Sequence, residues 1–488
     1  MRKDPPIWFC WLVLSMWCAA LFFYGMAAAE LWRTESLRAI IAEGMLRTGN
    51  WLVPTLYGEP LFTKPPGMYM AIALCSLPWG EVTEFSARLP SALAASVTVF
   101  LFYHLFTRYL GRAAGLLAGL MLPMSVMYLD KAPAAEIDML QVAWVAGAML
   151  CFLRAVENRR REFVTGAGWW LGALLCVAGG FLTKWTAPAF FYITAGSLLW
   201  WRGELRLLWS RQHLLSALVA GCLCLTWVVA AACLTGWDVF VNTVLSEALP
   251  RLWVPASSPQ HQRLSYGWGA AVYPWWILAA MLPWSIVALY SLRPSFLRAW
   301  DEKTQLLLLL FHCWAWPNLL FWTLMADHTP RYCFPLCPAI AGLAALVLHG
   351  WWTRRVPLPW PRIPPRRLLI SWLAVWLVVK VAFVEHVMPA RNGPREPRVK
   401  GRLLASLVPA GATLYLFRIK DEGIMFYFGG EVVRLASPDW LPSSGEPVYC
   451  ILNPAECDAL RQQRCVRLVS HMHDEQGAPI VLVQVSNQ

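Results

Sequence analysis

Apolar runs long enough to cross a lipid bilayer recur along most of this chain of 488 residues. A helix needs about 20 apolar residues (range 17–25) to span the hydrocarbon core, and about eleven runs approach that length. We expect spans at residues 7–29, 88–107, 113–130, 138–154, 166–183, 185–201, 213–235, 271–292, 304–325, 331–350 and 367–388. Only 14% of the residues are charged, whereas soluble domains average about 25%. The sequence therefore predicts an all-α polytopic membrane protein with about eleven transmembrane helices plus interfacial helices.

The basic residues gather in short segments that all lie on one side of these spans. They occur near residues 2–3, 108–112, 154–161, 202–211, 293–303 and 354–367. Cytoplasmic loops of membrane proteins carry an excess of lysine and arginine, so we assign this side to the cytoplasm. The net charge of +12 is explained by this asymmetry, and we expect no nucleic-acid partner. The opposite face then receives two external loops, 30–87 and 236–270, and everything after about residue 389.

The first external loop is polar, large and directly follows the first span. A simple connector needs only a few residues, so a loop of this size suggests a catalytic loop at the membrane surface. Within it, residues 66–79 are apolar but too short to cross, and we expect a helix that lies in the interface. We therefore divide the chain into a transmembrane catalytic domain, 1–388, and a tail, 389–488.

The tail has a different composition from the rest of the chain. A linker rich in Pro and Arg opens it, and strand-like runs follow at 412–418, 431–437, 448–452, 466–472 and 480–485. Between the third and fourth of these runs, Asn453-Pro454 marks the start of a short helix. We expect a small α/β domain that serves for docking or for positioning an acceptor. Cys450, Cys457 and Cys465 would face an oxidising compartment there, so one disulfide could form among them.

Two groups of carboxylates fall on the external side under this topology. Glu35 lies in a helical pattern of the first loop, and Glu136 and Asp138 lie with Asp130 at a turn between two spans. Each could instead be a first-turn carboxylate that complements a helix dipole or caps a helix. Three acids at one interfacial turn exceed what capping requires, so we take Glu35, Asp138 and Glu136 as candidate catalytic residues.

Cations on the same side form the matching group. They are Lys64 beside Pro65-Pro66, Lys184 in a tight turn, and Arg251, His261 and Arg263 in the second loop. A lone interfacial lysine usually snorkels to lipid headgroups. Several cations on a translocated face run against the general bias, and a bound phosphate would account for them.

Carboxylates and cations together imply a group transfer from a phosphorylated lipid. A carboxylate takes a proton from an acceptor hydroxyl or amine, and cations stabilise the phosphate as it leaves. The cytoplasmic loops are too short for a nucleotide-sugar domain. We therefore predict a polyprenyl-phosphate sugar as the donor.

Spaced motifs over residues 7–350 resemble those of one family of membrane glycosyltransferases. The matching segments are Met45–Pro54, Phe62-Thr63-Lys64-Pro65, Asp138 before Trp144, Leu182-Thr183-Lys184, Glu247 with Arg251, Gln260 and His261, and Arg331-Tyr332 with Pro335 and Pro338. In this order they resemble the bacterial lipid A aminoarabinose transferases and the protein O-mannosyltransferases, which share the GT-C fold.

The resemblance implies a GT-C glycosyltransferase in the bacterial cytoplasmic (inner) membrane, with an extracytoplasmic tail. It implies that Lys64, Lys184, Arg251, His261, Arg263 and Tyr332 bind substrate, and that the acceptor is a lipid such as lipid A, a glycan or a protein. The family's acidic pair is replaced by Thr34-Glu35, so the base could be Glu35, Asp138 or Glu136. Thr63 replaces the acid that some relatives use with a histidine to hold a metal. We therefore expect no zinc site, and leave open a loosely bound divalent metal near Glu35 or Asp138.

Two other function classes share many of these features. A transporter or flippase of polyprenyl-linked lipids would place ionisable residues near the bilayer midplane and show repeat symmetry. Neither feature is evident in this sequence. A non-catalytic, lipid-binding relative would explain Thr34 in the acidic pair.

Overall fold

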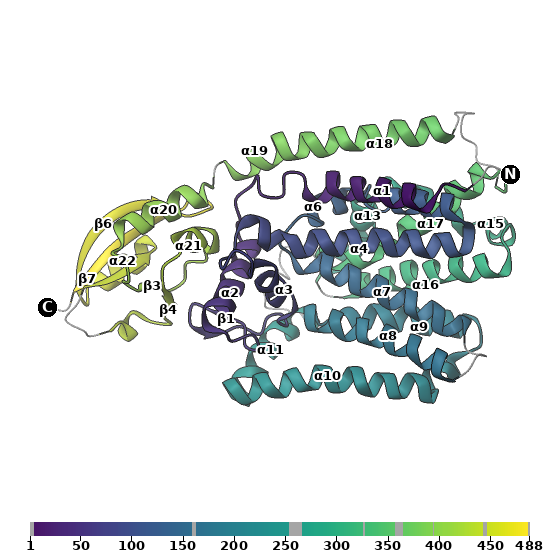
Figure 1. Cartoon of the computed structure of the whole chain (residues 1–488). Helices are drawn as coiled ribbons and strands as arrows, with labels where there is room; N and C mark the ends of the chain where they lie inside the picture. The colour runs from purple at the N-terminus through teal and green to yellow at the C-terminus, as the bar shows by residue number, and fades with distance from the viewer. Residues whose placement is uncertain are drawn as a thin grey trace. The chain divides into compact units, whose positions relative to one another are not determined.

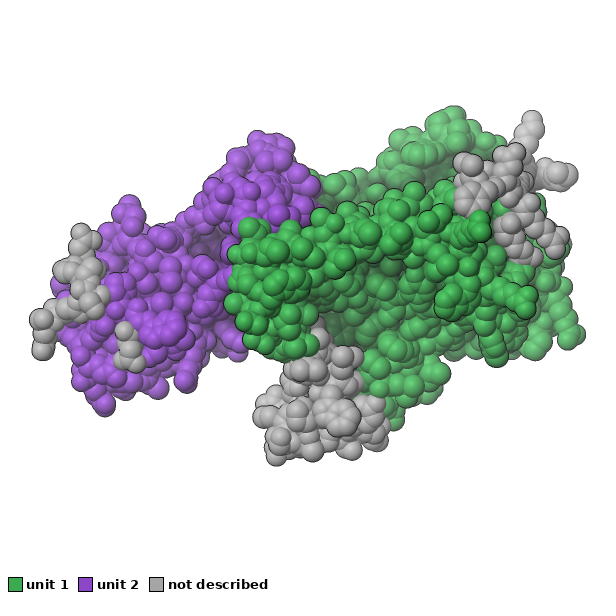
Figure 2. Space-filling view, turned by 90° about the horizontal axis from the view of Figure 1, so that it is seen from below, with its two compact units in different colours: residues 1–24, 62–68, 89–380 green, residues 25–61, 69–88, 381–488 purple. Residues whose placement is uncertain are grey.

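The computed structural model describes residues 4–158, 163–252, 266–325, 327–356, 365–393, 395–442 and 447–486. Its contacts divide the chain into two compact units (Figure 2). Unit 1 comprises residues 1–24, 62–68 and 89–380, and unit 2 comprises residues 25–61, 69–88 and 381–488. The predicted boundary at residue 388 stays a prediction. The contacts group most of the first predicted external loop with the tail, which the sequence did not suggest.

Unit 1 consists of packed helices, among which α7, α8 and α9 run alongside one another (Figure 1). The helices that lie wholly or mainly in it are α1 (Ile7–Cys18), η1 (Ala19–Phe23), α4 (Glu84–Leu110), α5 (Arg112–Met121), α6 (Val126–Lys131), α7 (Ile137–Glu157), α8 (Phe163–Thr183), α9 (Ala187–Trp201), η2 (Leu205–Trp209), α10 (Arg211–Thr235), α11 (Trp237–Leu252), α13 (Tyr266–Ala280), α14 (Trp284–Leu289), η3 (Tyr290–Leu292), α15 (Pro294–Arg298), α16 (Glu302–Leu324), η4 (Pro330–Leu336), α17 (Cys337–Trp352) and α18 (Pro365–Ala382).

Seven helices among the described residues are long and apolar enough to cross a membrane. They are Glu84–Leu110, Ile137–Glu157, Gly166–Thr183, Arg211–Thr235, Glu302–Leu324, Pro330–Trp352 and Arg367–Asn392. The pair α13 and α14, bent by 107°, is an eighth if it counts as one span. The predicted count of eleven is thus not reached and stays a prediction. The predicted first span is the shorter apolar helix Ile7–Phe23, and α3 (Gly67–Ser76) has only 10 residues, as expected for a segment too short to cross.

Close contact of α8 with α7 and α9 depends on two adjacent glycines near the end of α8. A Cβ on Gly179 would lie 2.8 Å from the indole of Trp144, and a Cβ on Gly180 would lie 2.6 Å from the Cβ of Ala187. Both distances are shorter than side chains tolerate, so only glycine allows this approach. The turn from α8 to α9 follows directly and carries Lys184, whose N–H donates to the Gly180 carbonyl at 2.8 Å.

The segment 62–68 lies against the same end of α8. A Cβ on Gly67 would be 2.7 Å from the Leu182 carbonyl oxygen, so glycine is required for this contact as well. Phe62 is fully buried and packs on Phe240 and Trp227, with ring centroids 4.7 and 6.4 Å away. These contacts attach the segment that carries Lys64 to α8, α10 and α11.

Unit 2 is built around a five-stranded sheet in the order β4-β3-β5-β7-β6. Its strands are β3 (Leu414–Leu416), β4 (Val432–Arg434), β5 (Val448–Leu452), β6 (Cys465–His473) and β7 (Pro479–Ser486), each at one of the strand-like runs of the tail. β3 pairs in parallel with β4 and β5, and β7 pairs antiparallel with β5 and β6. The first parallel connection runs through α21 (Glu422–Phe428). The yellow strands of Figure 1 show this sheet with α22 (Pro454–Arg461) near it.

Alternating side chains on the central strands build the core of this unit. Cys450 and Leu452 of β5 join Val481, Val483 and Val485 of β7 in one buried cluster with the inner face of α22. Asn453 and Glu456 form a capping box that begins α22, in agreement with the Asn-Pro signal. All fourteen cysteines of the chain are free, so the disulfide left open for the tail is not formed.

The remaining elements of unit 2 come from both ends of the chain. They are α2 (Thr34–Thr48), β1 (Thr55–Leu56), β2 (Glu59–Pro60), α3, η5 (Phe383–Val387), α19 (Met388–Asn392), α20 (Pro397–Leu407) and η6 (Pro438–Trp440). α20 packs on α21, and a Cβ on Gly401 would lie 2.6 Å from the Cβ of Tyr427. α2 packs on α21 as well, which brings the first loop against the tail.

Replacement of Gly180 tests the close approach at the α8–α9 turn. We expect Gly180→Ala to lower the thermal unfolding temperature of the detergent-purified protein, because overpacking typically costs about 1–3 kcal/mol. Gly168→Ala in the same helix is the matched control, since a Cβ there meets nothing within 4 Å. We expect it to be neutral or slightly stabilising. Equal unfolding temperatures for the two variants would contradict the packing argument.

Candidate functional site

A buried ion pair between α7 and the α8–α9 turn lies at the centre of the predicted site in unit 1. Lys184 Nζ lies 2.6 Å from Asp138 Oδ1, and the two side chains are only 3% and 1% exposed. Asp138 Oδ2 is buried and has no hydrogen-bond partner among the residues that the structure describes. Each of these two buried charges stabilises the other, because a single unpaired charge removed from water is strongly unfavourable.

Further charges from two other segments surround this pair. Glu136 precedes α7 and is 8% exposed; its Oε1 lies 3.5 Å from Lys131 Nζ and its Oε2 lies 3.6 Å from Arg331 Nη1. Lys131 also pairs with Asp130 at 3.1 Å. Three acids and three cations from residues 130–138, 184 and 331 thus form one cluster. The acids predicted to gather at this turn do lie together, and an equal number of cations forms ion pairs with them.

Tyr332 closes the cluster from the side of η4. Lys184 Nζ lies 4.7 Å from the centre of the Tyr332 ring, a cation–π distance. The ring is 8% exposed, and Trp322 of α16 lies 6.3 Å away from it. Lys184 is thus held between a carboxylate and an aromatic face, which fixes its position more firmly than a flexible surface lysine.

Lys64 lies at the same end of α8 as Lys184. Its Nζ donates to the carbonyl of Thr63 at 2.9 Å, and its side chain is half-buried. Gly67, three residues later, contacts Leu182 and Thr183. Three residues of extended chain span about 10 Å, so Lys64 is within reach of the Lys184 turn. The structure brings together Asp138, Glu136, Lys184 and Tyr332, and places Lys64 nearby.

Glu35 belongs to unit 2, where it forms a second buried ion pair. Arg88 donates from Nε to Glu35 Oε1 at 3.0 Å and from Nη2 to Glu35 Oε2 at 2.9 Å. Arg88 also donates to the carbonyls of Met26 and Ala29 at 2.7 Å and of Glu30 at 3.2 Å. Arg88 is 3% exposed, and we did not predict its role. The sequence feature that could have indicated this role is the position of Arg88 at the start of an apolar span.

The other predicted binding residues are not tested by this geometry. Arg251 lies in α11, where only the main chain is described, and His261 and Arg263 lie outside the described residues. Within the described ranges, no three His, Cys, Asp or Glu side chains are grouped so that they could hold a metal ion. The metal question left open by the sequence therefore gains no support from these residues.

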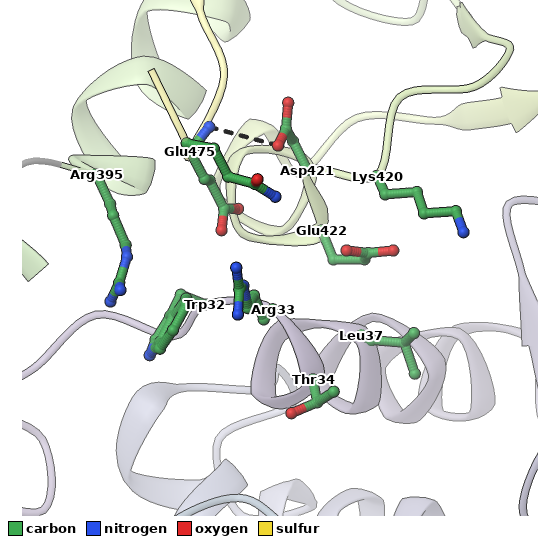
Figure 3. Close-up of a pocket in the computed structure, with 10 residues that line it drawn as sticks. Trp32, Arg33, Thr34, Leu37, Arg395, Lys420, Asp421, Glu422 and Glu475 are labelled. Atoms are coloured by element: carbon green, nitrogen blue, oxygen red, sulfur yellow. Dashed lines mark hydrogen bonds between the residues drawn. The ribbon is translucent and has the colours of Figure 1, made fainter. Parts of the chain in front are cut away.

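Unit 2 also contains a polar cavity of about 280 Å³ beside the start of α2 (Figure 3). Trp32 and Arg33 line it from the first loop, Arg395 from the segment before α20, and Lys420 and Glu422 from the start of α21. The Arg395 guanidinium lies 3.4 Å from the centre of the Trp32 ring. Figure 3 shows the Arg33 side chain directed toward the Glu475 carboxylate.

Three buried carboxyl groups share the wall of this cavity. Glu475 Oε1 accepts the N–H of Gly423 at 2.6 Å and of Ile424 at 3.2 Å, and Gly423 has no Cβ that would block it. Burial, and then the neighbouring Glu475 carboxylate, raise the pKa of Asp421 to about 7. Burial also raises the pKa of Glu422 and of Glu475. Asp421 therefore keeps a proton up to near neutral pH, where an exposed aspartate would have released it.

The sequence and the fold of this chain are similar to those of membrane glycosyltransferases. Residues 63–230 match a family model described as dolichyl-phosphate-mannose-protein mannosyltransferase. The chain is 28% identical over 362 residues to undecaprenyl phosphate-alpha-4-amino-4-deoxy-L-arabinose arabinosyl transferase 1 of Pseudomonas fluorescens, covering 71% of this chain and 59% of that protein. The corresponding transferase of Pseudomonas aeruginosa is 30% identical over 337 residues, with 66% and 55% covered. The matched region thus spans less than two thirds of these relatives.

Solved structures decide the fold. The crystal structure of ArnT from Cupriavidus metallidurans bound to undecaprenyl phosphate superposes with a TM-score of 0.75 and 16% identity, over 97% of each chain. This chain has the ArnT fold. The apo structure of the same ArnT gives a TM-score of 0.72 at 17% identity. With its long apolar helices and the ArnT fold, the chain is an integral membrane protein. The resemblance to aminoarabinose transferases and mannosyltransferases that the motifs indicated is confirmed.

A double-mutant cycle tests the energetic coupling of Asp138 and Lys184. We expect Asp138→Asn or Lys184→Met alone to destabilise the protein by roughly 3–5 kcal/mol, because each leaves one buried charge without its partner. The double variant should lose less than the sum of the two single losses. Thermal unfolding in detergent measures all four proteins. Additive losses would mean that the pair is not coupled in the folded protein.

The raised pKa of Asp421 predicts how stability varies with pH. Between pH 4 and about 7 the folded carboxyl keeps a proton that the unfolded chain has released, so stability falls as pH rises through this window. Asp421→Asn removes this term. We expect its unfolding temperature to exceed that of the wild type by roughly 3–8 °C at pH 8, and the difference to shrink progressively and vanish near pH 4. Asp458→Asn is the control, because the Asp458 side chain is 74% exposed; an equal effect at both pH values would contradict the assignment.

Proposed function

We propose that this chain transfers a sugar from a polyprenyl phosphate to a hydroxyl or amine acceptor at the extracytoplasmic face of a bacterial inner membrane. The ArnT fold supports this proposal, as does the similarity to Pseudomonas transferases that are named for an undecaprenyl-phosphate sugar. The family model matched at residues 63–230 is named for a transferase that uses a lipid-linked sugar as well.

The observation that carries the proposal is the Asp138–Lys184 pair with its open carboxylate oxygen. Asp138 Oδ2 is buried without a partner in the described part of the chain, while Lys184 and Arg331 supply positive charge within the same cluster. A base and cations in one water-poor site are what phosphate departure and acceptor deprotonation require.

In the proposed reaction the acceptor oxygen or nitrogen attacks the anomeric carbon of the donor sugar. The new glycosidic bond forms as the bond from that carbon to the phosphate oxygen breaks, with inversion. The acceptor's proton passes to a carboxylate, and polyprenyl phosphate leaves with the bonding electron pair. Lys64 and Lys184 stabilise the charge that accumulates on the phosphate.

Two carboxylates compete for the role of base. Both oxygens of Glu35 accept hydrogen bonds from Arg88, so both are already engaged within the protein. Asp138 engages Lys184 through Oδ1, and its Oδ2 has no hydrogen-bond partner in the described part of the chain, which makes it the better candidate. In this proposal Asp138 is the favoured base, Glu136 orients Lys131 and Arg331, and Glu35 holds Arg88. Arg251, His261, Arg263 and Tyr332 keep their proposed roles in binding substrate.

The identities of the donor sugar and of the acceptor are the finer parts of this proposal. An aminoarabinose carried by undecaprenyl phosphate is the first donor to test, because the similar transferases are named for it. Lipid A, protein and glycan acceptors are the arms of the same assay. About eleven spans, with the tail extracytoplasmic, complete the proposed topology.

One assay separates this function from the two alternatives. Purified protein in lipid nanodiscs or liposomes is incubated with labelled polyprenyl-phosphate sugar and each acceptor. Release of polyprenyl phosphate with labelled acceptor supports the transferase. Donor binding without release would indicate a lipid-binding relative, and movement of intact donor between liposome leaflets would indicate a flippase.

Substitutions at the site give the quantitative test. We expect Asp138→Asn, Lys184→Ala and Lys64→Ala each to lower turnover by about 10²–10⁴-fold, the range for loss of one acid–base or charge-stabilising group. Glu35→Gln should also lower turnover, since it leaves Arg88 unpaired. Lys303→Ala and Glu302→Gln, both exposed at the start of α16, are matched controls. Near-normal turnover of Asp138→Asn would remove Asp138 from the base role, and the same result for Glu35→Gln would remove Glu35 from the site.

A further inference from the structure

The tail of the chain contacts the Glu35–Arg88 pair through a second layer of hydrogen bonds. Glu84 lies one helical turn before Arg88 on α4, and all the groups that follow belong to unit 2. Glu84 Oε1 accepts from Tyr427 Oη at 2.8 Å and from Arg398 Nη2 at 2.5 Å. Two residues of the tail therefore converge on one carboxylate at the head of α4.

The same two tail residues also bind the main chain and side chain of residues 30–31. Tyr427 Oη accepts the N–H of Leu31 at 2.9 Å, so this hydroxyl bridges Leu31 and Glu84. The N–H of Arg398 donates to Glu30 Oε2 at 3.2 Å, and Arg398 Nε lies 3.9 Å from Glu30 Oε1. Arg88 holds the other side of this segment through the carbonyls of residues 26, 29 and 30.

Local sequence explains why Tyr427 reaches this position. Gly401 on α20 leaves room for Tyr427, because any Cβ there would lie 2.6 Å from the tyrosine Cβ. Burial raises the pKa of Tyr427, so its hydroxyl stays protonated and keeps donating to Glu84 at physiological pH. Replacement of this phenol by phenylalanine would remove the acceptor of the Leu31 N–H and one of the two donors to Glu84 Oε1.

We propose that Tyr427 and Arg398 are positioning residues that clamp residues 26–31 and the head of α4, so that Arg88 and Glu35 keep their bidentate geometry. The inference rests on the proposed glycosyl transfer and deepens it, because it assigns to the tail the task of holding the loop that carries Glu35. A carboxylate–guanidinium pair keeps two parallel hydrogen bonds only if both main chains stay in place. Displacement of a site by about 1 Å costs on the order of 10²-fold in rate.

The test compares tail variants of the full-length protein in nanodiscs. We expect Tyr427→Phe and Arg398→Gln to lower kcat by roughly 10–100-fold, while KM for the labelled polyprenyl-phosphate sugar changes by less than about threefold. Amide hydrogen exchange of residues 26–36 should accelerate by about tenfold in both variants. Arg398→Lys should recover part of the kcat, because lysine keeps a positive charge beside Glu84.

Matched controls separate positioning from a general loss of structure. Arg402→Gln changes an exposed arginine one turn further along α20, and Tyr415→Phe changes a tyrosine on β3. Both should keep wild-type kcat and exchange. Wild-type exchange at residues 26–36 in Tyr427→Phe would overturn the clamp. Faster exchange with unchanged kcat would overturn its role in the reaction, and absence of transfer by the wild type would instead overturn the proposed function.

Discussion

The cost of placing charge away from water is the constraint on which this structure depends. Asp138 and Lys184 are almost fully buried, and each is stable there only because the other lies 2.6 Å away. That requirement ties the start of α7 to the α8–α9 turn, and the glycines at 179 and 180 make the approach sterically possible. The other carboxylate oxygen, Oδ2, is also buried and has no hydrogen-bond partner among the described residues, so our proposed base and the pair that stabilises the fold share one side chain.

Unit 2 contains another buried charge that is stabilised by nearby partners, the guanidinium of Arg88. Arg88 is buried and directs its donors to Glu35 and to three carbonyls of the loop after α1 and η1. A planar guanidinium can satisfy many acceptors at once, which a lysine cannot. The tail adds Tyr427 and Arg398 to this network, so residues more than 300 positions apart in sequence share one set of hydrogen bonds. The tail is therefore part of the architecture of the first loop.

Several features could be read from the sequence because they depend on local composition or spacing. The apolar runs predicted long helices, and alternation in the tail predicted the strands around Cys450 and Val483. The acids at 130–138 and Lys184 were identified individually as candidates from their position at span ends. Arg88 was missed, because an arginine at the head of a helix has many ordinary uses. The cavity at Trp32 was not predicted for a similar reason, since its walls come from four separate segments.

The sequence by itself determined the membrane class, the order of elements and the types of side chain available for chemistry, since hydropathy and periodicity act over short distances. Only the tertiary structure decided which charges meet. It paired Asp138 with Lys184 and Glu35 with Arg88, and it brought Tyr427 to Glu84. Ion pairs and hydrogen bonds form between groups a few ångströms apart, and chain separation carries no information about that distance until the helices are packed.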